Sequence, residues 1–218
     1  MALRIFTNLS SLNSQRAMQI NNARLGSSLE RIASGIRLQR SSDDIAAMSV
    51  SDALKGDAVA LRQGAKNLAD GFSLINTADG AVSEQMSILI RLREITSQAA
   101  TGTIGDTERA TVNMEFSALR TEFDRIAATS EFNSRKLLDG SLSSGSSNAT
   151  VIQLGLDSSE NNRFNLNTEI NLSATTSGNL GFGTDTIATE AGALTAMSNL
   201  TEAIEELSAI RGRIGAVQ

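Results

Sequence analysis

The sequence predicts a mainly α-helical protein, an elongated antiparallel bundle of long, coiled-coil-like helices with a small β-hairpin region. Three observations support this fold class. Apolar residues recur every seven positions over one long stretch, aromatic residues make up only 3% of the chain, and proline is absent from its 218 residues. Leu, Ile, Ala and Met can pack helices together without large rings, and no proline interrupts a long helix.

The longest predicted helix extends from Asp43 to about Ala100. Its heptad pattern is typical of a helix that packs along its whole length against other helices. At roughly 1.5 Å per residue, about 57 residues would form a helix of about 85 Å. The acidic pair Asp43-Asp44 follows two serines, so helix capping explains it better than a metal or acid–base site. The predicted bundle seam consists of Leu54, Leu61, Leu68, Phe72, Ile75, Val82 and Leu89.

Three further helices are predicted from apolar residues spaced three and four apart. They cover residues 8–35, residues 106 to about 130, and residues 186–217. The loop before the second of these is short, so that helix is expected to run antiparallel to the long one. Gly64, Gly71 and Ala78 recur beside the seam and are expected to let a neighbouring helix approach closely.

Residues 139–185 differ from the rest because they are rich in Ser, Gly, Thr and Asn. Apolar residues alternate with polar ones around Ile152–Leu156 and again from Phe164 to Leu172, on either side of a turn-rich segment. This pattern predicts a β-hairpin. The predicted organisation is an N-terminal segment at 1–42, a helical bundle formed by 43–138 and 186–218, and a loop and β-hairpin region at 139–185.

Composition argues against several classes of function. The chain has 19 basic and 24 acidic residues, no histidine and no cysteine. A net charge of −5 leaves no electrostatic basis for nucleic-acid binding. Without the commonest general base and metal ligand, neither an enzyme nor a cofactor or metal site is expected. No apolar run approaches the ~20 residues that cross a bilayer, and the N-terminus lacks a cleavable signal's apolar core.

The end of the long helix carries a second apolar stripe. Ile88, Leu92 and Ile95 lie on a different helix face from Leu89, which belongs to the seam. A helix with two apolar faces needs a second partner, either another element of this chain or another subunit. Arg91 and Glu94 lie off both stripes and are available for polar recognition.

Several motifs, taken in order, resemble those of the bacterial flagellins. They are Ser27-Ser28-Leu29-Glu30-Arg31-Ile32-Ala33-Ser34-Gly35, Asp43-Asp44-Ile45-Ala46-Ala47-Met48, Asn67-Leu68-Ala69-Asp70-Gly71-Phe72, Leu92-Arg93-Glu94-Ile95, Glu131-Phe132-Asn133-Ser134-Arg135-Lys136-Leu137-Leu138 and Ile214-Gly215-Ala216-Val217-Gln218. The resemblance implies a subunit of the extracellular flagellar filament that self-assembles for swimming motility. It also implies secretion through the flagellar type III export apparatus without a cleaved signal peptide.

The resemblance also implies particular contacts. Flagellins of many bacteria are sensed by Toll-like receptor 5, and by motif position the receptor or subunit contact residues are Leu89, Arg91, Glu94, Ile95 and Glu115. Relative to large flagellins, the outer domains are expected to be reduced to the hairpin and its loops. The C-terminal helical segment that flagellins carry beyond this region is expected to be lacking.

Two alternative functions remain open at this point. A hook-filament junction protein has similar helices, although the Ser-Asp-Asp and Phe-Asn-Ser-Arg-Lys-Leu-Leu motifs would be unexpected in it. A secreted coiled-coil interaction module outside the flagellum is the alternative from a different class.

Overall fold

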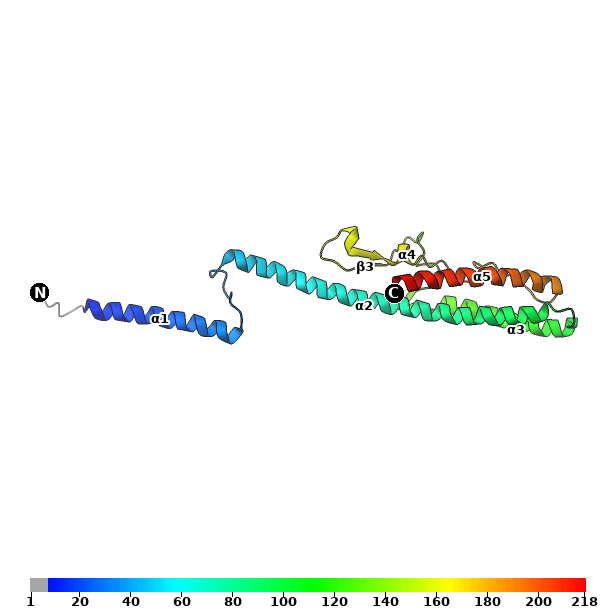
Figure 1. The fold of residues 1–218 in the computed structure, drawn as a ribbon, viewed down its shortest axis with the longest axis horizontal. Helices are drawn as coiled ribbons and strands as arrows, with labels where there is room; N and C mark the ends of the chain where they lie inside the picture. Colours follow the sequence, from blue (N-terminus) through cyan, green and yellow to red (C-terminus); the bar gives the residue numbers. More distant parts are fainter. Residues whose placement is uncertain (1–7) are drawn as a thin grey trace. The chain divides into compact units, whose positions relative to one another are not determined.

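The computed structural model describes residues 8–218 (Figure 1). The first of two compact units ends at Val59, and the second is Ala60–Gln218. Each unit is described by itself. The expectation that the chain lacks a cleaved signal concerns its first residues, of which 1–7 lie outside the described part. The proposed division at residues 42, 138 and 185 stays a prediction.

The predicted fold class is confirmed, because long helices dominate the described residues and the strands are short. The α-helices are α1 (Leu9–Ser34), α2 (Ile45–Ala99), α3 (Asp106–Thr129), α4 (Leu166–Glu169) and α5 (Glu190–Val217), with one 3₁₀ turn, η1 (Glu160–Asn162). Two antiparallel pairs are formed by β1 (Glu131–Phe132) with β2 (Arg135–Lys136), and by β3 (Val151–Gln153) with β4 (Arg163–Asn165).

In the first unit, short polar side chains and one glycine set the helix ends. The Asn8 side chain accepts a hydrogen bond from the Ser11 amide, and α1 ends at Gly35, which has a left-handed φ of 68°. The Asp44 carboxylate accepts from the Ala47 amide at 3.0 Å in the first turn of α2. The capping interpretation of the acidic pair is therefore confirmed for Asp44, while Asp43 forms an ion pair with Arg31.

The second unit is built on α2, α3 and α5, which lie side by side (Figure 1). Gln85 of α2 donates to the carbonyl oxygen of Phe123 in α3, and Asp79 of α2 forms an ion pair with Arg211 of α5. Both neighbours run antiparallel to α2, as predicted, since Arg91 lies opposite Glu115 and Asn76 opposite Gln218. A single apolar core joins the three helices to the segment from Leu137 to Ile187.

The predicted seam is only partly buried. Ile75, Val82 and Leu89 lie in the core, whereas Leu54, Leu61, Leu68 and Phe72 are 62%, 51%, 38% and 36% exposed. The prediction that all seven pack in the bundle is therefore wrong for the first four. Gln218, next to the last residue of α5, is bonded to Asn76, so the buried seam residues lie at the level of α2 that α5 covers, and the other four precede that level along α2.

A polar stripe on α3 holds the segment that precedes α5. The Asp124 carboxylate accepts from the amide and the hydroxyl of Ser177, both at 2.7 Å. Closer to the start of α3, Arg120 donates to the carbonyl oxygen of Asp185, and Asn113 accepts from the Ile187 amide. These bonds satisfy backbone groups of an irregular segment and fix it on the helix.

The predicted hairpin exists but is shorter than the alternating pattern suggested. Pairing ends at Asn165, because the Asn165 side chain caps α4 by accepting from the Asn167 amide at 3.0 Å. Leu166, Ile170 and Leu172 are buried as expected, but they lie in α4 and the coil after it. The alternating pattern therefore predicted the burial of these three residues correctly, but it predicted a strand where the chain forms a short helix and coil.

The neighbour at the small residues of α2 is this hairpin and not a helix. A β-carbon at Gly64 would overlap the carbonyl oxygen of Leu154, and one at Gly71 would overlap the end of the Ile152 side chain. The predicted close approach is thus real, but its partner was predicted wrongly. Asn67, between the two glycines, donates to the Gln153 carbonyl oxygen at 3.0 Å and fixes β3 on α2.

The two-residue turn between β1 and β2 has both residues at positive φ, Asn133 at 49° and Ser134 at 63°. This is the arrangement of a type I′ hairpin, in which glycine is favoured at the second position. We expect Ser134→Gly to raise the free energy of unfolding by about 1 kcal/mol, since the left-handed conformation costs serine more than glycine. Urea denaturation followed by circular dichroism measures this change.

The matched control is Ser158→Gly, an exposed loop residue without positive φ. It should give no gain in stability. Equal stabilisation by both glycines would contradict the assignment of strain to Ser134.

Candidate assembly surface

An exposed charge cluster joins α2 to α3. The Arg91 guanidinium donates to Glu115 from Nη2 at 2.7 Å and from Nε at 3.2 Å, and from Nη1 to Glu94 at 2.7 Å. The hydrogen bond to Glu115, and then the one to Glu94, raises the pKa of Arg91 above its ordinary value. The structure thus brings together three of the five contact residues predicted from the sequence, and all three are accessible to a partner.

The other two predicted contact residues are not accessible. Leu89 and Ile95 are fully buried in the core, so their assignment to a receptor or subunit contact is wrong. The second apolar stripe, with Ile88 and Leu92, is buried as well and belongs to the core shared with α3 and α5. Of the two alternatives for this stripe, cover by the chain's own elements is the correct one.

A different side chain of the same helix faces solvent. Ile90 is 59% exposed, and Arg93 and Glu94, one turn further on, are exposed on the same face. We call these three residues the Ile90 stripe. Sequence reasoning missed it because the run from Ile88 to Ile95 is apolar on more than one face, and only the packing decides which apolar residue stays outside.

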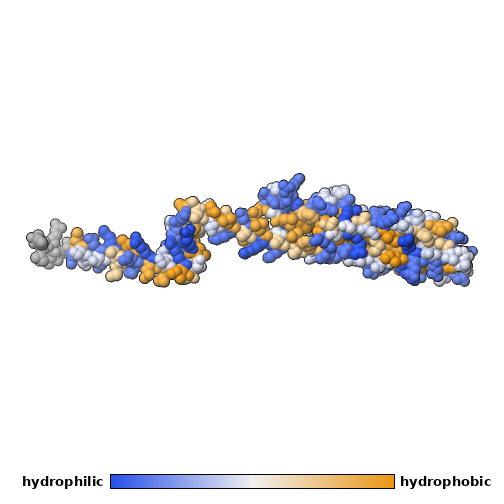
Figure 2. Space-filling model, in the orientation of Figure 1, coloured by the Kyte–Doolittle hydropathy of each residue, from blue (hydrophilic) through white to orange (hydrophobic). Residues whose placement is uncertain are grey.

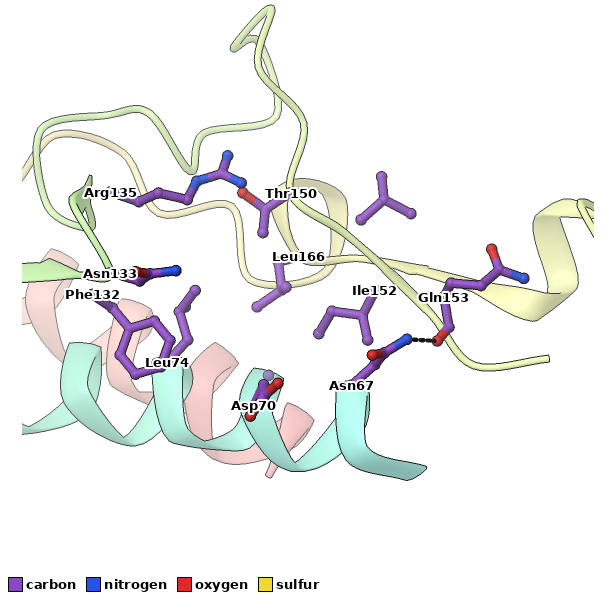
Figure 3. A pocket seen from close by; sticks show the side chains of 12 residues that line it. Asn67, Asp70, Leu74, Phe132, Asn133, Arg135, Thr150, Ile152, Gln153 and Leu166 are labelled. Atoms are coloured by element: carbon purple, nitrogen blue, oxygen red, sulfur yellow. Dashed lines mark hydrogen bonds between the residues drawn. The ribbon is translucent and has the colours of Figure 1, made fainter. Parts of the chain in front are cut away.

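A cavity of about 340 Å³ lies where α2 meets β3 and the β1–β2 turn (Figure 3). We call it the α2–β3 cavity. Leu74, Ile152 and Leu166 supply its apolar wall, and all three belong to the core. Asp70 from α2 and Arg135 from β2 bring one charge of each sign to its lining. The sequence offered no signal for this cavity, since its walls come from four separate segments.

The surface of the second unit combines apolar and charged groups. On the face shown in Figure 2, hydrophobic and hydrophilic residues are interspersed over this unit instead of forming one continuous apolar patch. Within residues 8–218, no helix is long and apolar enough to cross a membrane, and no group of three acidic side chains could hold a metal ion. The interspersed apolar and charged groups on this face suit protein contacts with both apolar and ionic components.

Comparison with known proteins assigns the chain to a family. The family described as the bacterial flagellin N-terminal helical region matches residues 5–143, more than half of the 218 residues. The chain belongs to the bacterial flagellin family. A flagellin of Halalkalibacterium halodurans is 33% identical over 211 residues, which cover 97% of this chain and 74% of that protein.

Other flagellins match over a smaller part of their own length. A flagellin of Clostridium tyrobutyricum is 40% identical over 134 residues, covering 62% of this chain and 36% of the relative. Flagellin A of Vibrio cholerae is 38% identical over 163 residues, and the match spans 43% of its length. The chain therefore spans less than half the length of several of the flagellins that it matches.

Solved structures agree with this assignment. The crystal structure of Bacillus cereus flagellin superposes with a TM-score of 0.56 and is 28% identical, covering 68% of this chain and 80% of that one. The long helices of this chain are thus a feature that it shares with a solved flagellin, as the resemblance in sequence implied.

Proposed function

We propose that this flagellin-family chain is a structural subunit of the bacterial flagellar filament and self-assembles through helix packing for swimming motility. The observation that carries the proposal is the family match across residues 5–143. Helix faces with exposed apolar residues, such as Leu54, Leu61 and Leu68, suit a chain whose packing is completed by other copies. The role is structural and involves no catalysis; a chain without histidine and cysteine is in keeping with it.

The proposal includes an extracellular location. The chain would leave the cell through the flagellar type III export apparatus without a cleaved signal peptide. The basis for this part is the family assignment alone.

The experiment that tests the filament role is deletion of the gene, followed by electron microscopy of the cell surface. We expect the deletion strain to lose its filaments and a plasmid copy of the gene to restore them. Loss of only a junction between hook and filament, or filaments that persist unchanged, would contradict the proposal.

The cluster of Arg91, Glu94 and Glu115 is proposed as the contact surface for other subunits or for Toll-like receptor 5. Its support is geometric, since the three side chains are exposed and their helices are fixed by the buried Leu89 and Ile95 beneath them. An arginine held by two carboxylates has its guanidinium oriented before a partner arrives, which lowers the entropy cost of binding.

We expect Arg91→Ala to weaken receptor activation at least about tenfold, which corresponds to roughly 1.4 kcal/mol of binding free energy. The reason is loss of the charge-assisted hydrogen bonds that order Glu94 and Glu115. A cell-based reporter assay with purified monomer measures the half-maximal concentration.

The control is Arg125→Ala. Arg125 is an exposed arginine of α3, and like Arg91 it forms an ion pair with a glutamate, in this case Glu122 of the same helix. It should leave activation unchanged. An Arg91→Ala protein as active as the parent would remove receptor binding from the proposed roles of this cluster.

A further inference from the structure

We propose that the α2–β3 cavity receives Ile90 from a second copy of this chain, with Arg93 and Glu94 of that copy pairing with Asp70 and Arg135. The inference rests on the proposed filament function and identifies two surfaces that meet when copies assemble. It is carried by the chemistry of the cavity and by a search of the exposed apolar side chains for a matching partner.

The cavity is lined by polar and charged groups that have no partner among the described residues. Neither Asp70 nor Arg135 forms an ion pair or side-chain hydrogen bond with another described residue, although both line the cavity (Figure 3). The Thr150 hydroxyl also lines it and is buried without a hydrogen-bond partner. Its volume of about 340 Å³ is more than ten times the ~30 Å³ that one water molecule occupies. The complementary group is therefore an apolar side chain flanked by one positive and one negative charge.

Only one exposed large apolar side chain on the helices of the second unit meets this description. The candidates on its helices are Leu61, Leu68, Phe72, Ile90, Met114 and Leu194. On a helix, the residues that flank a side chain on its own face are three and four positions away. Ile90 has both Arg93 and Glu94 there, whereas each of the other five lacks a basic residue at these positions.

The charges of the Ile90 stripe are available for such a contact. Arg93 forms no ion pair or hydrogen bond with another described residue through its side chain, and Glu94 is bonded to Arg91 through only one oxygen, Oε2. Docking would give Asp70 and Arg135 each a partner of opposite charge, as is usual in complementary interfaces. Ile90 would lose its exposed apolar surface to the wall formed by Leu74, Ile152 and Leu166.

The positions of the two surfaces fit polymerisation. Asp70 and Ile90 are about 20 residues apart along α2, or roughly 30 Å at 1.5 Å per residue, so the stripe and the cavity do not overlap. A contact between two different patches of identical chains is heterologous, and it repeats without closing unless the rotation forms a ring. Each copy would offer its stripe to one neighbour and its cavity to another.

Cysteine cross-linking tests this contact, because the chain has no cysteine of its own. Cells would produce Ile90→Cys/Asn133→Cys, with Asn133 at the cavity lining, and sheared filaments would be oxidised and run on a denaturing gel. We expect a ladder of covalent multimers, at least about tenfold stronger than with Leu194→Cys/Asn133→Cys, in which the first cysteine replaces an equally exposed residue of α5.

A charge exchange provides a second test that does not depend on cysteine geometry. Asp70→Arg and Arg93→Asp should each reduce the number of filaments per cell at least about tenfold, since each places like charges together. The chain with both substitutions restores the opposite pair and should recover filaments. Circular dichroism of each purified monomer checks that its helices form.

The outcomes separate this inference from the function on which it rests. Filaments that contain the Ile90→Cys/Asn133→Cys chain, but give no ladder above the Leu194→Cys/Asn133→Cys control, overturn the docking and leave the filament role intact. A double charge exchange no better than either single substitution overturns it as well. Parent filaments that do not contain the chain would instead contradict the proposed function.

Discussion

Phe123→Ala is expected to lower the free energy of unfolding by about 3–5 kcal/mol, the usual cost of removing a buried aromatic ring. Phe123 is fully buried in the core between the helices and contacts Phe182 edge to face, with ring centroids 5.3 Å apart. The contact ties α3 to the irregular segment before α5, so the cavity left by alanine would loosen both. Chemical denaturation followed by circular dichroism at 222 nm measures the change.

The control for this prediction is Phe72→Ala, which removes the same ring from a residue that is 36% exposed. We expect a clearly smaller loss, because more than a third of the Phe72 surface is already exposed to water in the folded protein. A loss equal to that of Phe123→Ala would show that Phe72 packs in the monomer after all and would restore this residue to the seam.

Gly64→Ala is expected to destabilise the second unit by about 1–3 kcal/mol, the typical cost of overpacking. The added β-carbon would overlap the Leu154 carbonyl oxygen, a backbone atom that cannot move without displacing β3. Detachment of β3 would also break the bond from Asn67 to the Gln153 carbonyl oxygen. Hydrogen exchange at the amides of β3 and β4 should therefore rise in this variant.

Two other glycines of α2 make the prediction specific. Gly80→Ala meets no atom within 4 Å and should stabilise the helix by up to about 1 kcal/mol, the difference in helix propensity. Gly71→Ala meets only the flexible end of Ile152, so its effect should lie between the other two. Stabilisation by Gly64→Ala would mean that the hairpin does not rest on α2 at this point.

The helices could be predicted from sequence because their signals are local. Asn8, Gly35 and Asp44 lie within a turn of the helix ends that they set, and the loop before Asp106 is only a few residues long. Capping side chains and left-handed glycines act on the nearest backbone groups, so the residues that determine a helix end lie next to it in the sequence. The boundaries of α2 and α3 were accordingly close to those predicted.

Long-range partners could not be predicted in this way. The heptad pattern of α2 continues without change from Leu54 to Leu89, yet burial begins only at Ile75, where α5 reaches it. Asn67 is bonded to a residue 86 positions away, and nothing near Asn67 in the sequence indicates that partner. The periodicity of a helix shows which faces are apolar and does not show what covers them.

The candidate contact surface was likewise predicted only in part. Arg91, Glu94 and Glu115 were expected at the surface and are found there, because a charged side chain is rarely buried without a partner. Leu89 and Ile95 were assigned to the same contact by motif position, but apolar residues beside an exposed charge can equally belong to the core beneath it. The cavity that includes Asp70 and Arg135 depends on four segments meeting in space.

A side-chain-resolution electron cryomicroscopy map of filaments from the bacterium that encodes this chain would test the central claim most directly. The account predicts a repeating subunit with α2, α3 and α5 antiparallel, the Phe123 ring against Phe182, and this chain's side chains in the density. A filament whose repeating subunit has a different sequence, or whose helices are packed around a different core, would contradict it.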